Sequence, residues 1–501
     1  MGTIANMAVG FFFAPFILHR LGDVAYGVWV LAISVVSYLG LLDLGMQSSV
    51  LRFISKGHTR GDHQGASDAL SAALWVRLQI SVVVMLLSAG LAAVFPVFFK
   101  VPADLASDAR ISILLIGLTT AITMSLGVAG GVLSGLNRYD LTNMVNLAST
   151  AVRIIGIVIV LKTGHGIVGI AVCELLAGLV GNVLLIVIAR RLYPELRVRI
   201  SKPRRETLRA MWSYSSYAFL TTIAVQLVYQ TDNLVVGAFV STAAVTYYAI
   251  GNSLTRYASQ LVGSIAGTFV PAASTYEAAG DSAGLLTLYK NGTRLTILVS
   301  LPILVTFLVR GHSFIGLWMG PQYAEMSGNV LILLSIPLFL AYANRTASSI
   351  AFGVEKHKML AVAAIIEGVS NLVLSLALAR YYGIYGVAIG TLIPSLAVQI
   401  IFWPRYISTL VGLSAFEVIW QVWTPVFLSA IPFAMVSYAI ERSHPAHSLM
   451  VFVLQLAVTL PVFFITVALI FRTYIRNEVM PRVCSLLGLG RTSGYTGAAK
   501  D

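Results

Sequence analysis

Long apolar stretches recur along the whole chain, and many of them are long enough to cross a lipid bilayer as a helix. The run from Tyr26 to Val50 is typical, because Asp43 is its only charged residue. A transmembrane helix needs about 20 residues of this kind. Only helices and closed barrels pair all their backbone polar groups in lipid, and these runs lack the alternation of barrel strands. The sequence therefore predicts an all-α, polytopic membrane protein.

Composition supports this class and excludes several others. The chain is 58% hydrophobic and 11% charged, whereas soluble domains carry about 25% charged residues. The net charge of +13 does not indicate a nucleic-acid partner, because most of the basic residues lie in alternate loops. Cys173 and Cys484 are far apart in the sequence, and His444 and His447 form only a lone pair. We therefore expect no disulfide framework and no metal site.

Apolar runs of about 17–25 residues predict about 14 transmembrane helices. The first begins almost at Met1 with no basic segment before it, so we expect no cleaved signal peptide and place the natural start a few residues upstream. The predicted spans are 3–18, 26–50, 71–96, 109–134, 141–161, 166–189, 211–239, 245–272, 293–310, 327–351, 359–379, 384–404, 418–440 and 448–471.

Lysine and arginine are unevenly divided between the two sets of loops. One set holds about three times as many basic residues as the other, which predicts that both termini are cytoplasmic. The basic residues expected on the outer side are Arg20, Lys100, Arg110, Lys162, Arg310, Arg380 and Arg442. The longest basic loop, residues 190–210, is expected to contact anionic membrane lipids.

The two halves of the chain resemble each other. SGLNRYDLTNM (134–144) matches AFGVEKHKMLA (351–361), and HGIVGIAV (165–172) matches YGIYGVAI (382–389), at an offset near 217 residues. A repeat of about six helices predicts two bundles related by a pseudo-two-fold axis along the membrane normal, as in alternating-access carriers. The predicted divisions are a first six-helix bundle (1–189), a basic cytoplasmic linker (190–210), a second bundle (211–406), two additional helices (407–472) and a cytoplasmic tail (473–501).

Eight charged residues fall within the predicted helices, where lipid exposure of each would cost roughly 2.5–3.5 kcal/mol. They are expected to face a cavity or one another. They are Arg77, Arg153, Arg256, Arg345, Asp43, Glu174, Asp232 and Glu367.

Depth separates these charges. Arg77 and Arg345 lie near predicted cytoplasmic helix ends, where an arginine can reach the headgroups. Arg153 and Arg256 lie nearer mid-helix, where a guanidinium group suits a phosphate or diphosphate ligand; a substrate-binding and a structural role remain equally open. Asp43 lies at a depth comparable with Arg77, so an Asp43–Arg77 ion pair is the leading interpretation, ahead of a gating or coupling role.

The predicted helix 211–239 carries polar residues at helical spacing. Gln226, Tyr229, Gln230 and Asn233 share one face and Asp232 borders it. This face lines a substrate cavity or forms hydrogen bonds between helices. Asp232, Glu174 and Glu367 are candidate sites for a coupling H⁺ or Na⁺, and no other cofactor is indicated.

Several segments resemble the polysaccharide-transporter branch of the multidrug/oligosaccharidyl-lipid/polysaccharide flippase superfamily. They are residues 15–55, SGLNRYDLTN (134–143) and YQTDNLVVG (229–237). The resemblance implies a non-enzymatic flippase of the bacterial inner membrane that moves undecaprenyl-pyrophosphate-linked oligosaccharide outward for surface polysaccharide synthesis. It also implies possible contact with polysaccharide polymerase or export machinery. By position in related flippases, Arg20, Arg52 and Arg256 are similar to substrate-binding arginines, and Asp43 to a functional acid.

Two alternatives differ in chemistry. A multidrug exporter of the same fold would have an acid-dominated cavity, whereas here four arginines balance four acids. A membrane glycosyltransferase or polymerase would require an acidic catalytic cluster or a large outer loop, and the sequence shows neither. A scaffold without transport activity is not excluded by the sequence.

Overall fold

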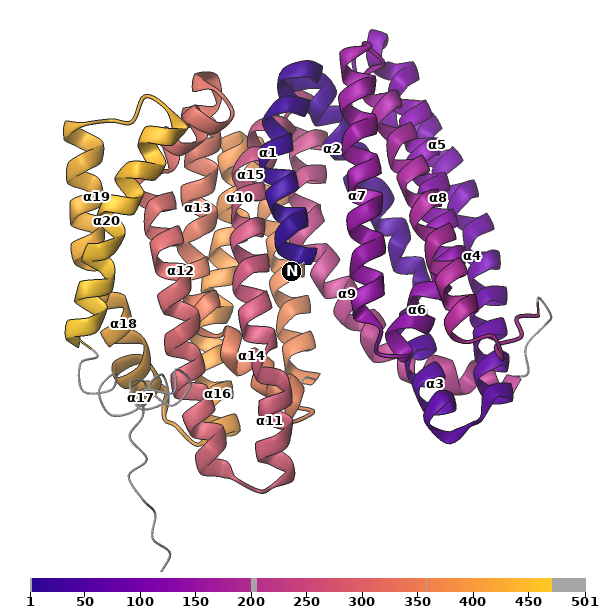
Figure 1. Cartoon of the computed structure of the whole chain (residues 1–501). Coiled ribbons are helices and arrows are strands. Elements are labelled where there is room, and N and C mark those ends of the chain that lie inside the picture. The colour runs from indigo at the N-terminus through magenta and orange to yellow at the C-terminus, as the bar shows by residue number, and fades with distance from the viewer. Residues whose placement is uncertain (1, 200–204, 357, 471–501) are drawn as a thin grey trace, which may run out of the picture.

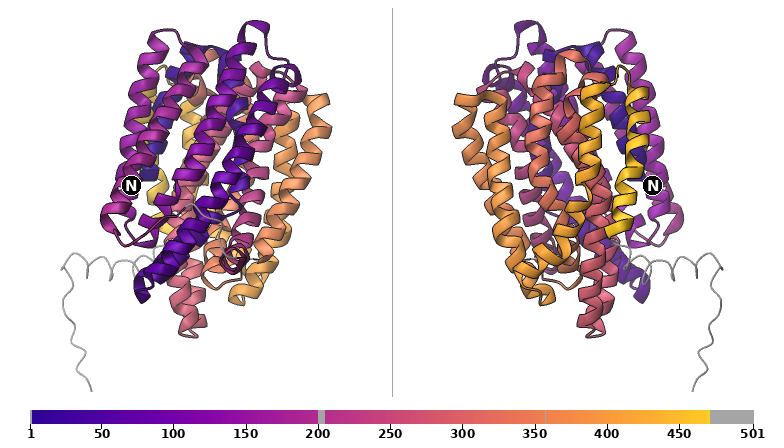
Figure 2. Two further views of the ribbon diagram at one scale, coloured as in Figure 1. Left: turned by 90° about the vertical axis from the view of Figure 1, so that its right-hand side faces the viewer. Right: turned by 90° about the vertical axis from the view of Figure 1, so that its left-hand side faces the viewer.

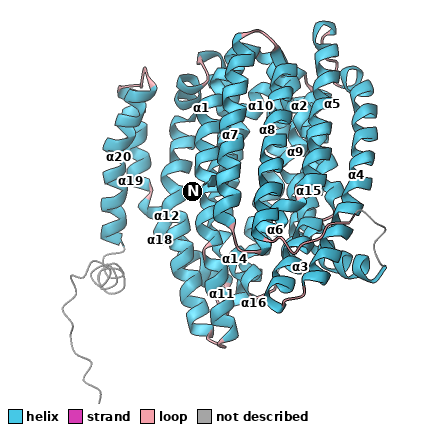
Figure 3. Cartoon of the chain, turned by 45° about the vertical axis from the view of Figure 1, so that its right-hand side comes forward, coloured by secondary structure: helices cyan, strands magenta, loops and turns pink. Residues whose placement is uncertain are grey.

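The computed structural model describes residues 2–199, 205–356 and 358–470 (Figure 1). These residues are helical throughout, with short connections and no strand, which confirms the all-α prediction (Figure 3). The predicted tail with Cys484, and Met1, lie outside the described residues, as does the side chain of Tyr229.

The first half of the chain forms an N-terminal bundle, drawn in indigo to magenta in Figure 1. Its elements are α1 (Gly2–Leu21), α2 (Asp23–Leu39), the 3₁₀ turn η1 (Gly40–Asp43), α3 (Met46–Arg60), α4 (His63–Phe98), α5 (Ala103–Leu126), α6 (Val128–Gly135), α7 (Tyr139–Lys162) and α8 (Gly166–Leu192).

The second half forms a C-terminal bundle, and a further helix pair follows it at the end of the described chain. The bundle elements are α9 (Arg205–Phe239), α10 (Thr242–Gly267), α11 (Phe269–Ala278), α12 (Ser282–Trp318), η2 (Pro321–Tyr323), α13 (Ala324–Ala343), α14 (Arg345–Gly353), α15 (Lys358–Ala397), the π-helix η3 (Val398–Phe402) and α16 (Trp403–Val411). The remaining elements are α17 (Ala415–Glu417), the π-helix η4 (Val418–Trp423), α18 (Thr424–Ser429), α19 (Ile431–Ser443) and α20 (Leu449–Ile470).

Ten helical runs among the described residues are long and apolar enough to span a membrane, and the shorter apolar helix Met7–Leu21 precedes them. The predicted count of 14 is therefore not confirmed. One run contains two predicted spans, because Gly383 in α15 has φ 56° and ψ −133° and reverses the chain direction between its two arms. The multi-pass membrane class itself is confirmed.

Four of the predicted spans in the two bundles are interrupted, and the interruptions occupy matching places in the two halves. In the first half they lie at Leu44–Gly45, where both residues have positive φ, and at Gly127. In the second half they lie at Thr268 and Asn344. Gly127 and Asn344 are separated by the repeat offset found in the sequence. These breaks correct the prediction of continuous helices over 26–50, 109–134, 245–272 and 327–351, and they support the two-fold repeat.

The linker prediction needs a smaller correction. Residues 190–210 were expected to join the bundles as a loop, but α8 continues to Leu192 and α9 already begins at Arg205. From there α9 starts beside α3 and α4 and then runs into the C-terminal bundle, where it packs against α15 (Figure 1). The domain boundaries of the sequence analysis therefore remain predictions.

The two bundles meet along a seam formed by α2 with α9 and α10. At its upper end Thr246 donates a 2.6 Å hydrogen bond to the carbonyl of Asp23, and Tyr247 donates to its carboxylate at 3.2 Å. Tyr323 of η2 donates to the same carboxylate. Toward the side that carries α3 and α11, the bundles diverge (Figure 1). The seam therefore closes the predicted outer side in this conformation.

Gly27 allows the close approach of α2 and α10 in this seam. A Cβ at Gly27 would lie 1.9 Å from the carbonyl oxygen of Thr242, so Gly27→Leu must push the two helices apart. With a cysteine at the fully buried position Thr246, we expect Gly27→Leu to raise its labelling by a membrane-impermeant maleimide at least about tenfold, which corresponds to about 1.4 kcal/mol of population shift.

The matched control for this experiment is Gly90→Leu in α4, because a Cβ at Gly90 meets open space. Labelling of the cysteine at position 246 should not change in that variant. Unchanged labelling in Gly27→Leu as well would show that the contact does not hold the seam closed.

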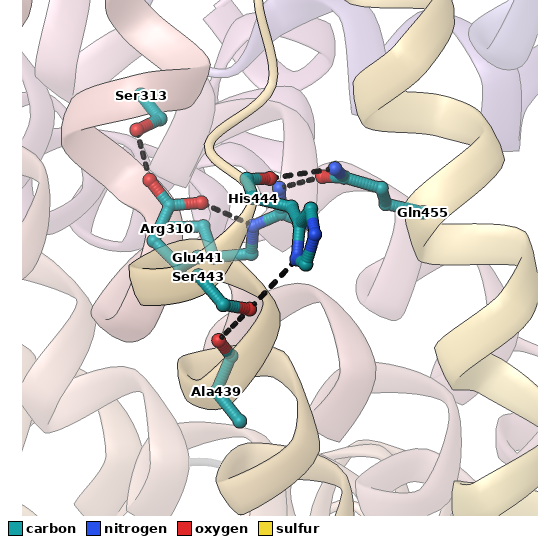
Figure 4. A network of polar contacts seen from close by, with 7 residues as sticks. All are labelled: Arg310, Ser313, Ala439, Glu441, Ser443, His444 and Gln455. Carbon is teal, nitrogen blue, oxygen red and sulfur yellow. Dashed lines mark hydrogen bonds and ion pairs between the residues drawn. The ribbon is translucent and has the colours of Figure 1, made fainter.

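The last helix pair, α19 and α20, stands against one side of the C-terminal bundle (Figure 2). A buried ion pair joins it to α12: Arg310 Nε lies 2.7 Å from Glu441 Oε2 (Figure 4). Arg310 also donates to Gln455 of α20, and its guanidinium carbon lies 4.3 Å from the centre of the Phe452 ring. The predicted helix 293–310 ends too early, because α12 continues to Trp318 and buries the Arg310 side chain. The predicted outer location of Arg310 remains a prediction.

Candidate functional site

Each bundle contains a pocket that is lined in part by charged side chains. The pocket of the C-terminal bundle, called the C-pocket below, has a volume of about 310 Å³ and contains the charged residues Asp232, Arg345 and Glu367. The pocket of the N-terminal bundle, the N-pocket, has a volume of about 480 Å³ and contains Arg153 and Glu174. Five of the eight intramembrane charges predicted to face a cavity or one another thus line these two pockets.

Asp232 is the most enclosed carboxylate of the C-pocket. Its Oδ2 accepts hydrogen bonds from Tyr248 at 2.6 Å and Thr391 at 2.9 Å. Its Oδ1 is buried and has no donor within the described part of the chain. The side-chain oxygen of Asn371 accepts from Ser375 at 2.8 Å and from Thr391 at 3.3 Å beside it. Asn371 also brings a buried amide nitrogen that has no partner among the described residues. A carboxylate beside hydroxyl and amide oxygens is a donor set that a hard cation or a proton can use.

The chain reversal at Gly383 assembles this oxygen cluster. One arm of α15 carries Asn371 and Ser375, and the other carries Thr391. The arms approach so closely that a Cβ at Gly390 would lie 2.4 Å from Ser375 Oγ. Glycine at this position therefore permits the two arms to place their polar side chains next to Asp232 on α9.

Arg345 enters the C-pocket at a helix break. The break at Asn344 is held by a 2.8 Å hydrogen bond from the Asn344 amide to Gln399 in the π-helix η3, and π-helical turns frequently occur at functional sites. The guanidinium group of Arg345 packs near Gly263, and no carboxylate of the described residues lies within 4.0 Å of it. Glu367 lines the same pocket. The exposed Arg345 side chain lines this pocket, and its predicted reach to the headgroups remains a prediction.

The two charges of the N-pocket face each other. Arg153 Nη1 lies 3.6 Å from Glu174 Oε2, and the two side chains are 36% and 32% exposed. Deeper in the same bundle, Arg77 forms a 2.6 Å ion pair with Asp43 and donates to Gln47 at 3.1 Å. The Asp43–Arg77 pair expected from depth is therefore present, and it lies at the break between α2 and α3.

The polar face of α9 contacts α2 in this conformation. Gln226 donates to Ser37 at 2.5 Å, and Gln230 and Asn233 bond to Ser34 at 3.2 and 3.1 Å. These contacts match the interhelical interpretation of the face. A role for Gln226, Tyr229, Gln230 and Asn233 in substrate binding remains a prediction.

The other predicted substrate-binding arginines are separated in this conformation. Arg20 ends α1 and lies 6.0 Å from the Phe16 ring. Arg52 is exposed on α3, where it shares a shallow basic surface with Lys56 and Arg60. Arg256 is partly buried on α10, and no described carboxylate lies within 4.0 Å of it. The structure does not bring these three together.

Comparison with known proteins decides the family. Residues 1–277, more than half of the chain, match the family model described as "Polysaccharide biosynthesis protein". The chain belongs to this family. It is 25% identical over 79% of its length to the membrane protein EpsK of Bacillus subtilis, also covering 79% of that protein. It is 22% identical over 82% of its length to a Haloferax volcanii protein named "Probable low-salt glycan biosynthesis flippase Agl15", covering 83% of it.

Solved structures show the same fold. The structure titled "Lipid II flippase MurJ, inward closed conformation" superposes with a TM-score of 0.70, covering 94% of this chain and 100% of that one at 16% identity. An inward-facing MATE transporter of the MOP superfamily superposes with a TM-score of 0.66, covering 82% and 95% at 16% identity. The family match confirms the predicted resemblance to polysaccharide-biosynthesis membrane proteins, and the solved structures show that the chain has the polytopic fold of these flippases and transporters.

Sequence reasoning missed three neighbours of Asp232: Tyr248, Asn371 and Thr391. None is charged, so none stands out in an apolar helix. The available signal was the clustering of small polar residues with glycine, in GVSNLVLS (368–375) and VAIGT (387–391), which a membrane helix uses for close packing.

Proposed function

We propose that the protein moves an undecaprenyl-diphosphate-linked oligosaccharide from the cytoplasmic to the outer leaflet of the bacterial inner membrane, for assembly of a surface polysaccharide. Both termini would then be cytoplasmic, and a cation or proton at Asp232 would drive the cycle. The observation that carries this proposal is the C-pocket, where an arginine without a carboxylate partner and an oxygen-lined aspartate share one cavity inside the bundle. The family match supports the glycan, and the fold supports alternating access.

Arg345 suits the diphosphate group. A guanidinium group binds phosphate oxygens through two parallel hydrogen bonds, and the described residues offer Arg345 no competing carboxylate within 4.0 Å. Arg256, Arg153, Arg52 and Arg20 are further proposed contacts as the substrate moves through the protein. Of these, Arg52 lies on the basic surface of α3, where an anionic substrate would first arrive.

The position of Asp232 suits a role in coupling cation or proton binding to movement of the two bundles. Its chain neighbours Thr231 and Asn233 bond across the bundle seam, to Tyr38 at 2.8 Å and Ser34 at 3.1 Å. A change in occupancy at the Asp232 carboxylate therefore acts on α9 where this helix holds the two bundles together. Glu174, Glu367 and Asp43 remain proposed secondary coupling or gating sites.

The decisive experiment deletes the gene and complements the deletion with variants. Loss of the protein should trap lipid-linked glycan in the cytoplasmic leaflet. Because hydrogen bonds to a charged group contribute about 1.5–3 kcal/mol, Arg345→Ala should reduce surface polysaccharide by at least about tenfold. Arg345→Lys should restore it only in part, because lysine lacks the bidentate geometry.

The control is Arg138→Ala, which removes an exposed arginine that pairs with Asp140 at 2.9 Å and should export normally. Normal surface polysaccharide after gene deletion, together with new sensitivity to cationic drugs, would instead identify a multidrug exporter of the same fold.

A further inference from the structure

The N-pocket has a different chemical character from the C-pocket. Its lining is rich in hydroxyl and amide side chains, supplied by four helices and the start of α3. The polar members used below are Gln47, Thr123, Asn146, Ser149 and Asn182. Glycines of α6 and α8 complete the wall.

The pocket is elongated along α7. Its lining extends from Thr142, one turn from the start of α7 at Tyr139, to Arg153. Eleven residues of helix correspond to about 16 Å along the axis. The pocket therefore leads from the end of the helix on the predicted cytoplasmic side to mid-membrane, and it fits an extended ligand.

The N-pocket has no excess charge. Arg153 and Glu174 are its only charged lining residues. Because they lie 3.6 Å apart, the two opposite charges compensate each other without forming a tight bidentate contact. A ligand that enters between the two groups can accept hydrogen bonds from the guanidinium and donate hydrogen bonds to the carboxylate. A diphosphate or a carboxylated sugar would gain no net electrostatic attraction here, so the pocket favours a polar, uncharged ligand.

Hydrogen-bonding capacity in the pocket is unused. Ser149 Oγ is buried and has no partner within the described residues. Asn146 is exposed toward the pocket and makes no side-chain hydrogen bond to another described residue. The exposed Asn146 amide is available to a ligand directly. Because a buried polar group without a partner costs about 1–3 kcal/mol, a side-chain movement that uncovers Ser149 Oγ to a ligand's hydroxyl or amide group would be favourable.

We propose that the N-pocket binds the uncharged sugar rings of the lipid-linked glycan, through their hydroxyl and acetamido groups, while the diphosphate is bound by arginines outside it. This inference rests on the proposed function and adds a division of labour between the two bundles. It predicts that the pocket binds neutral sugars more tightly than acidic sugars.

The test uses the full-length protein in lipid nanodiscs, free of glycoside detergent, and saturation-transfer NMR. The probes are N,N′-diacetylchitobiose as a neutral disaccharide, glucuronic acid as an acidic sugar, and inorganic pyrophosphate. We expect chitobiose to bind more tightly than glucuronic acid. Asn146→Ala and Ser149→Ala should each weaken chitobiose about fivefold, the loss of about one hydrogen bond, and leave pyrophosphate binding unchanged.

The matched control is Asn143→Ala, which removes an exposed amide from the same helix but not from the pocket lining. Equal weakening by the Asn143 and Asn146 variants, absent chitobiose binding, or tighter binding of glucuronic acid would each overturn the inference. The pyrophosphate probe distinguishes failure of this inference from failure of the proposed function. Pyrophosphate binding without chitobiose binding contradicts the sugar pocket. Chitobiose binding without pyrophosphate binding supports the pocket and contradicts the diphosphate assignment.

Discussion

Asp232→Asn is expected to abolish glycan export while the protein still folds and reaches the membrane. The amide has nearly the shape of the carboxylate, and it can still accept from Tyr248 and Thr391, which donate at 2.6 and 2.9 Å. What it lacks is the negative charge that would hold a cation or take up a proton. Since removing one partner of a buried charged contact costs about 2–5 kcal/mol, transport should fall by at least about thirtyfold.

The measurement is the ratio of glycan trapped in the cytoplasmic leaflet to polysaccharide at the surface, at equal protein level in the membrane. Asp140→Asn is the matched control, because Asp140 is exposed, pairs with Arg138 at 2.9 Å and lines neither pocket. Its transport should keep the wild-type rate and the wild-type dependence on Na⁺ or H⁺. The same dependence in Asp232→Asn would remove this residue from the coupling mechanism.

The class of fold could be predicted from the sequence because hydrophobic length is a local property. Each predicted span needs only its own residues, and the described spans lie on helices. The helix breaks could not be predicted in this way. Gly45 takes φ 73° and immediately precedes the start of α3, whereas Gly131 lies within α6 and packs against Val50. Only the three-dimensional contacts distinguish these two glycines.

The candidate site shows the same division. Asp232 was identified because one charge in an apolar helix is costly and therefore conspicuous. Asn371 and Thr391 are uncharged and lie more than 130 residues away, on two arms that meet because the chain reverses at Gly383. The early end predicted for the helix over 293–310 has a related cause. Glu441, the partner of Arg310, lies 131 positions away, so the end of the apolar run was taken as the end of the helix.

Arg310→Ala is expected to produce the largest loss of stability in the chain. Its side chain is 1% exposed, and it bonds to Glu441 at 2.7 Å and to Gln455 while lying over Phe452 (Figure 4). Removing one partner of a buried ion pair leaves the other charge uncompensated and costs about 3–5 kcal/mol. Thermal unfolding of the purified protein in nanodiscs should show this loss, and Glu441→Ala should show a similar one. The exposed-pair variant Arg138→Ala is the control and should unfold like the wild type.

The double variant Arg310→Met/Glu441→Leu separates the charge from the packing. An apolar pair of similar volume is often neutral or stabilising relative to a buried ion pair, so the double variant should recover most of the stability that either alanine variant loses. It should also export glycan normally, because this pair attaches α19 and α20 to α12 and lines neither pocket. A double variant that is stable but unable to export would show instead that the charges take part in the transport cycle, and wild-type unfolding of Arg310→Ala would show that the helix pair is held by apolar contacts alone.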